Sequence, residues 1–172
     1  GVRASHRFAA DEWTLAGNAF VSHVEGAPAA IARTQLQPRH LFQRPDAPHL
    51  TFDPTRTSMD GAAASAMLSR SGGPGPVYGG VGGELRTPGF EVNDMGFQQG
   101  GDVAIGYAFA SVRDDQPGDV LLQSGINFNA YVATDFAPWL ASFGGNINGS
   151  ALFTNFWNVN GGVGWDKNRW DF

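Results

Sequence analysis

The sequence predicts an all-β fold in which about seven antiparallel strands follow one another up and down in chain order. Three observations predict it: apolar and polar residues alternate through most of the chain, turn-forming residues separate the alternating segments, and helical periodicity is nearly absent. Alternation with period two places successive side chains on opposite faces of a sheet. We therefore expect one sheet over residues 1–172 and no separate second domain.

The clearest strand is 120–134, because one side of it is apolar and the other side carries small or amide side chains. The apolar side comprises Val120, Leu122, Ile126, Phe128 and Val132, and the amide side includes Gln123, Asn127 and Asn129. Segment 102–109 has a similar pattern, from which we place Val103, Ile105, Tyr107 and Phe109 on the apolar side. Residues 114–118 form the turn between these two strands.

Five further segments complete the expected sheet. Residues 139–148, which contain Asn146 and Asn148, and residues 157–165 show clear alternation. The alternation is weaker in residues 13–22, 57–69 and 77–86. Residues 27–37 predict a helix of one or two turns, since Pro28 suits the first helical position.

The small fraction of charged residues indicates that part of this sheet contacts lipid. Only 16% of residues are charged, against roughly 25% in typical globular domains. The thirty residues 136–165 carry no charge, but their five Asn and six Gly exclude a membrane-spanning helix. A closed barrel is the other structure that can cross lipid. Small polar residues opposite an apolar parity favour such a barrel, whereas a soluble β-sandwich, the alternative, usually has charged residues on its wet face.

Several classes of function find little support. A net charge of -5 argues against nucleic-acid binding, and the absence of cysteine excludes disulfides and thiolate sites. The four histidines lack zinc-site spacing and are expected to be isolated, and the glycines of 79–83 lack the lysine and helix of a phosphate-binding loop. We therefore expect no cofactor, no metal and no catalytic residues, although carboxylates converging in one cleft would indicate an enzyme.

Two intervals, 26–54 and 87–96, are too irregular for strands and contain the candidate site. The candidate residues are Arg44, Asp46, Asp53, Arg56, Glu91, Asn93 and Asp94. Their mixed charges favour an ion-pair clamp between two loops. Calcium binding near Glu91, or saccharide binding assisted by Phe42 or Phe52, is the alternative. The amides Gln123, Asn127, Asn129, Asn146 and Asn148 either line a polar channel or bond one another.

Residues 43–46, 53–58 and 87–97 resemble the signature stretches of an uncharacterised bacterial family. In that family, a domain similar to family-9 carbohydrate-binding modules precedes a large outer-membrane-type β-barrel of unknown function. The resemblance implies an interior fragment of that barrel, with an open curved sheet, located in a Gram-negative outer membrane. It also suggests a turn near 154–155, whereas local turn chemistry favours Asn148-Gly149.

From this resemblance we expect a passive pore, receptor or anchor. Its partners would be outer-membrane lipid and, through the N-terminal domain of the family, a saccharide. Two alternatives from other classes are a soluble carbohydrate-binding β-sandwich and a part of a glycoside-active enzyme. The position of the apolar side chains separates the sandwich from the membrane barrel, because in a sandwich these side chains must pack between two sheets.

Overall fold

The computed structural model describes residues 1–92, 98, 100–137 and 140–168, and these residues form one β-sheet with a single helix. The strands and the helix follow in the order β1 Val2–Phe8, β2 Trp13–Glu25, α1 Pro28–Gln35, β3 Ser58–Arg70, β4 Val77–Arg86, β5 Val103–Asp114, β6 Leu121–Thr134, β7 Leu140–Phe153 and β8 Asn158–Asn168. The all-β prediction is therefore confirmed, with eight strands in place of about seven.

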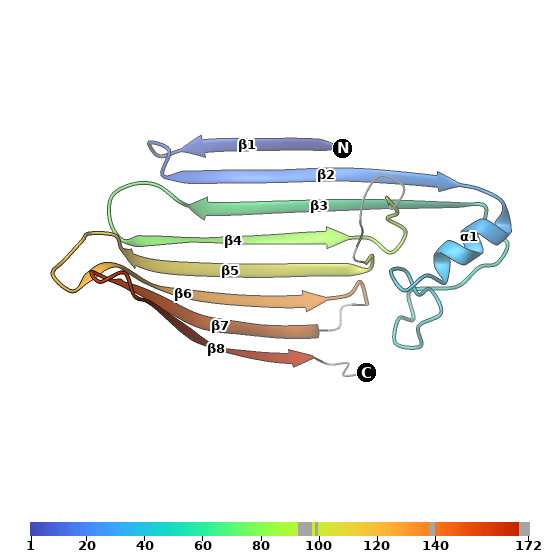
Figure 1. The fold of residues 1–172 in the computed structure, drawn as a ribbon. Coiled ribbons are helices and arrows are strands. Elements are labelled where there is room, and N and C mark those ends of the chain that lie inside the picture. The colour runs from blue at the N-terminus through green and yellow to red at the C-terminus, as the bar shows by residue number, and fades with distance from the viewer. Residues whose placement is uncertain (93–97, 99, 138–139, 169–172) are drawn as a thin grey trace.

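The eight strands are antiparallel and pair in chain order from β1 to β8. Strands β1 and β8 each pair on one side only, so the sheet is open, as expected, and is not closed into a barrel (Figure 1). The strand that the sequence analysis missed is β1, because Arg3, His6 and Arg7 obscure its short alternation. The turn between β7 and β8 occupies 154–157, and Asn148 and Gly149 lie inside β7.

The two ends of the sheet differ in their connections (Figure 1). Short turns at 9–12, 71–76, 115–120 and 154–157 join the strands at one end, which we call the turn end. The opposite end, the loop end, carries the 26–57 segment with α1 and the described residues 87–92, 98, 100–102 and 135–137. The irregular intervals of the sequence therefore gather at one end of the sheet.

The pairing register divides the strand residues into two faces, because directly paired residues in an antiparallel ladder point to the same side. One row across the sheet runs through Leu15, Leu68, Val81, Ala108 and Ala130. We call its side the hydrophobic face. Every exposed large hydrophobic side chain on a described strand, except Phe20, lies on this face. No second sheet covers it among the described residues.

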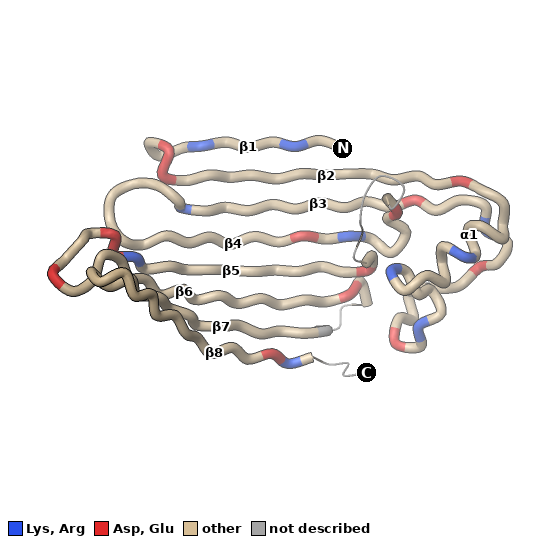
Figure 2. Tube along the Cα trace, viewed as in Figure 1, with Lys and Arg blue, Asp and Glu red and all other residues tan. Residues whose placement is uncertain are grey.

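The opposite side, which we call the polar face, carries the amides and several charged residues. The charged residues in strands on this face are Arg3, Arg7, Glu84, Arg86, Arg113 and Asp166. On both faces, the described Asp, Glu, Lys and Arg residues of the strands lie near strand ends (Figure 2).

The apolar side assigned to β5 from the sequence was wrong. Phe109 pairs with Asn129 and Tyr107 with Tyr131, so these aromatic residues lie on the polar face. The hydrophobic face of β5 consists instead of Ala104, Gly106, Ala108, Ala110 and Val112. The hydrophobic residues of one strand do not reveal which of its sides lies on the hydrophobic face here, because the small residues of β5 pair with large residues of β6. Ala110, for example, pairs with Phe128.

The hydrophobic core lies at the loop end, over the polar face. Met59, on the polar face of β3, is 1% exposed and packs with Ile31 of α1 and Phe42 of the following loop. Segment 87–92 lies directly on β3: a β-carbon built on Gly61 would come within 2.1 Å of the Phe90 amide nitrogen. We call residues 26–57, 87–92, 98, 100–102 and 135–137 the loop cap, since they cover this end of the polar face.

Helix α1 is short and amphipathic, and its buried side chains are Ile31 and Gln35. Pro28 begins it, as expected, and Gln35 fixes its end to the loop by bonding both backbone groups of Asp53. In the described part of the chain, no helix has the length and apolar character needed to cross a membrane.

Candidate functional site

Asp102 is the centre of one polar cluster in the loop cap. Its carboxylate, 2% exposed, accepts hydrogen bonds from Arg44 Nη2, from His49 Nε2 at 2.8 Å and from the Phe136 backbone amide at 3.2 Å. Its φ of +55° is left-handed, a conformation that Asp adopts more readily than most residues. One carboxylate therefore joins three separate segments of the chain.

Glu91 is the centre of a second cluster. Its Oε2 atom lies 2.9 Å from His40 Nε2 and 3.5 Å from Arg39 Nε. The side chain of His40 is fully buried, and its Nδ1 atom lies 2.8 Å from the Pro88 carbonyl oxygen. Glu91 is also fixed to the sheet, since its backbone amide donates to Ser22 Oγ on the polar face of β2.

The two clusters show how the predicted clamp residues are placed. Glu91 connects the two loops, through Arg39 and His40, and Arg44 connects them through Asp102. Asp46 does not join the loops, since its ion pair, at 4.0 Å, is with Arg44 of its own loop. Asn93 and Asp94 lie outside the described residues.

Asp53 and Arg56 take no part in these clusters. Asp53 closes a local turn by accepting hydrogen bonds from the hydroxyl and backbone amide of Thr55, and these bonds lower the pKa of its carboxyl. Arg56 lies over the ring of Phe42, 5.9 Å from its centre, in a cation–π contact. Both residues therefore stabilise the 26–57 segment itself.

The expectation of isolated histidines was wrong. His40 and His49 contact Glu91 and Asp102, and His23 on β2 lies 2.7 Å from Asp60 on β3. Neither histidine spacing nor local charge identifies these contacts, because each joins residues at least 37 positions apart. Asp102 directly precedes Val103, the first residue of β5, and no motif in the sequence identifies it as the centre of a cluster.

The predicted lumen amides all lie on the polar face, where the four asparagines form a ladder across β6 and β7. Asn127 donates to Asn148 Oδ1 at 2.9 Å, Asn129 donates to Asn146 Oδ1 at 2.9 Å, and Asn148 donates to Asn146 Oδ1 at 2.8 Å. Gln123 stands apart from the ladder and donates to Asp115 at 2.6 Å. The amides bond one another and still line the open polar face.

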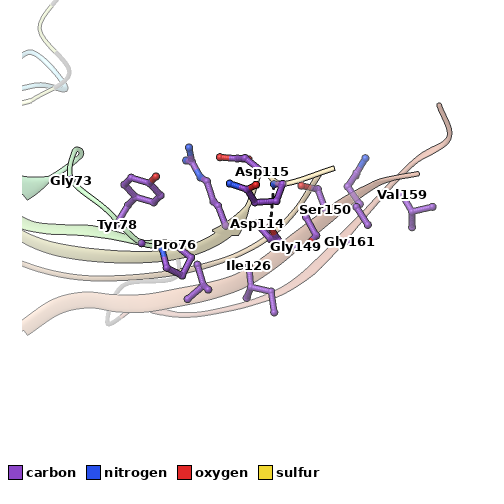
Figure 3. Close-up of a pocket in the computed structure, with 18 residues that line it drawn as sticks. Gly73, Pro76, Tyr78, Asp114, Asp115, Ile126, Gly149, Ser150, Val159 and Gly161 are labelled. Carbon is purple, nitrogen blue, oxygen red and sulfur yellow. Dashed lines mark hydrogen bonds between the residues drawn. The ribbon is translucent and has the colours of Figure 1, made fainter. Parts of the chain in front are cut away.

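A hollow of about 1100 Å³ lies at the turn end. Tyr78, Asp115 and Ser150 project to one side of its strands, and Ile126 and Val159 project to the other side (Figure 3). The Arg113 guanidinium lies 5.5 Å from the centre of the Tyr78 ring. The polar face therefore continues from the loop cap to the turn end as one surface with hollows.

No arrangement of three or more His, Asp or Glu side chains in the described part of the chain could hold a metal ion. No family model, curated protein sequence or solved structure matches the chain. Membership of the barrel family that residues 43–46, 53–58 and 87–97 resemble is therefore a proposal.

The loop cap gives a first prediction. Asp102→Asn keeps the size of the side chain but replaces an acceptor oxygen with an amide that faces the Arg44 donors. Loss of one partner from a buried charge pair costs about 3 kcal/mol, so the free energy of cap opening should fall by that amount. Amide hydrogen exchange of residues 26–57 should accelerate accordingly.

Asp46→Asn is the matched control. Asp46 lies in the same segment as Arg44, but its Oδ1 atom is 4.0 Å from Arg44 Nε, which is too far for a hydrogen bond. Exchange in this variant should resemble that of the parent protein. Equal exchange rates in the Asp102 variant and the parent would show that Asp102 does not hold the cap together.

Proposed function

We propose that this sheet is part of the wall of an outer-membrane β-barrel, with the hydrophobic face toward lipid and the polar face toward a water-filled interior. The observation that carries the proposal is the one-sided exposure of large hydrophobic side chains. Monomeric soluble proteins rarely expose continuous apolar patches of more than a few hundred Å². Hydrocarbon is the solvent in which such a face is stable.

The dimensions of the hydrophobic face support the proposal. On β2, β4 and β5 its uncharged part extends over Trp13 to Val21, Val77 to Leu85 and Ala104 to Val112, nine residues each. A tilted membrane-spanning strand needs about 9 to 11 residues. The flanking charges, such as Glu25, Arg70 and Asp114, would lie in the headgroup regions on either side.

The polar face and the loop cap favour a solute pathway or receptor. Amide and small side chains suit a wet interior, and the loop cap covers that interior at one end only. The protein would act without a cofactor, by selecting what enters past the cap and what contacts the polar face. A link to saccharides, which the family resemblance implies, belongs to this proposal.

Arginine substitution on the two faces tests the proposal. Ala130 is exposed at the middle of β6 on the hydrophobic face, and Asn129 is its neighbour on the polar face. In lipid vesicles, Ala130→Arg should lower the free energy of unfolding by about 2–4 kcal/mol, because arginine is costly at the centre of a bilayer. Urea titration of the refolded variants measures this difference.

Asn129→Arg is the matched control and should cost about 1 kcal/mol, the value of its hydrogen bond to Asn146. If the hydrophobic face were in water, Ala130→Arg would change stability by no more than about 0.5 kcal/mol, as exposed surface substitutions usually do. That outcome would contradict the proposal.

The proposal also predicts the orientation in the membrane. Outer-membrane barrels have short periplasmic turns and longer extracellular loops, so the loop end should face outward. The chain has no cysteine, so single cysteines can be placed at Arg33 on α1 and at Gln116 in a turn. A membrane-impermeant maleimide on intact cells should label Arg33→Cys, whereas Gln116→Cys should react only after lysis. The reverse pattern would invert the orientation.

A further inference from the structure

Three aromatic rings on the polar face lie over glycines of neighbouring strands. A β-carbon built on Gly82 would come within 2.8 Å of the Tyr107 ring, and one built on Gly80 within 2.9 Å of the Phe109 ring. Between β6 and β7, on the same face, a β-carbon built on Gly144 would come within 2.9 Å of the Tyr131 ring. Each ring therefore occupies the space that a side chain at the neighbouring glycine would need.

These rings and the amide ladder form one continuous patch. Phe109, Asn129 and Asn146 are paired in one row across β5, β6 and β7. The next row pairs Tyr107 with Tyr131. A hollow of about 460 Å³ is lined by all five of these residues.

The ladder leaves hydrogen-bonding atoms open beside the rings. Asn127 and Asn129 use their amide nitrogens in the ladder, and their Oδ1 atoms have no hydrogen-bond partner in the part of the chain that the structure describes. The Asn146 amide nitrogen and the Tyr107 hydroxyl are also without partners among those residues. The patch therefore offers acceptors and donors side by side.

The charge of the patch is low. One carboxylate on this face, Asp166, lines the hollow and accepts hydrogen bonds from the Tyr131 hydroxyl and from Asn168. Arg113 lies toward the turn end, with its guanidinium over Tyr78 and Nε donating to Ser111. The described residues that line the hollow include no lysine or arginine to attract an anion, and the Asp166 carboxylate can accept hydrogen bonds from ligand hydroxyls.

We propose that this patch binds a neutral, polyhydroxylated ligand, of the kind found in uncharged oligosaccharides. A sugar ring presents an apolar face of C–H bonds, which fits the flat aromatic rings, and hydroxyls that both donate and accept, which fit the open amide atoms. Tyr107 and Phe109 supply the stacking surfaces, and Asn129 and Asn146 supply the directional contacts. The inference rests on the proposed function, since the polar face must border the water-filled interior.

Glycine at positions 80 and 82 would then serve the ligand site as well as the sheet. Gly82→Ala would push the Tyr107 ring away from the strand and spoil the flat surface. A purely structural role for the rings explains their contact with the glycines, but it does not predict that any sugar binds.

Calorimetric titration of the full chain in detergent micelles tests the proposal, with maltohexaose, cellohexaose and xylohexaose as neutral probes and hexagalacturonic acid as the charged comparison. At least one neutral probe should bind, and more tightly than the charged one. Phe109→Ala should weaken binding about tenfold, equivalent to about 1.4 kcal/mol. Asn129→Ala and Tyr107→Ala should weaken it similarly.

Phe128→Ala is the matched control, because Phe128 is an aromatic neighbour of Asn129 on the hydrophobic face, and its affinity should equal that of the parent. Absence of binding by every neutral probe, or equal affinities for the Phe109 and Phe128 variants, would overturn the proposal. Vesicle insertion measured with Ala130→Arg is independent of sugar binding. If no sugar binds but the protein still inserts into vesicles, the ligand-site proposal is wrong and the barrel proposal is unaffected.

Discussion

Solvation of the hydrophobic face is the constraint on which the rest of this structure depends. A single sheet cannot bury one face against itself, and the described residues supply no second layer over this one. At roughly 25 cal/mol per Å² of apolar surface, leaving Val81, Val163 and Trp165 in water is costly, since each is at least 54% exposed. Hydrocarbon around the face removes this cost without any further protein contacts.

The same constraint explains the position of the charges and loops. Ions within a lipid-facing band are unfavourable, which agrees with the position of the charged strand residues near strand ends and with the pairing of Glu84 and Arg86, at 3.1 Å, on the polar face. The loop cap is fixed to that face too, through Met59 and Ser22. Its clusters around Asp102 and Glu91 pair buried charges of opposite sign, although the Nε atoms of Arg39 and Arg44 are buried without a hydrogen-bond partner among the described residues.

The alternation of β6 and β8 was sufficient to predict both faces, because most large apolar residues there take one parity and the amides take the other. It failed in β5, where Tyr107 and Phe109 are needed to fill the space above glycines, a requirement that belongs to the neighbouring strand. Mixed charge predicted a clamp between Arg44 and Glu91 or Asp94, whereas Arg44 contacts Asp102 and Glu91 contacts Arg39 and His40, which were not among the candidates. Asp102 contacts Arg44, and His40 contacts Glu91, because the fold brings distant segments together. Such contacts cannot be predicted from a single sequence.

The central claim, that lipid surrounds the hydrophobic face, is tested most directly at Trp165, which is 54% exposed on that face. A variant that keeps Trp165 and replaces the other four tryptophans by phenylalanine is refolded into vesicles, and its fluorescence is measured with lipids brominated along their acyl chains. The account predicts strong quenching by the brominated chains and little quenching by acrylamide in the water. Quenching by acrylamide alone would place this face in water and contradict the account.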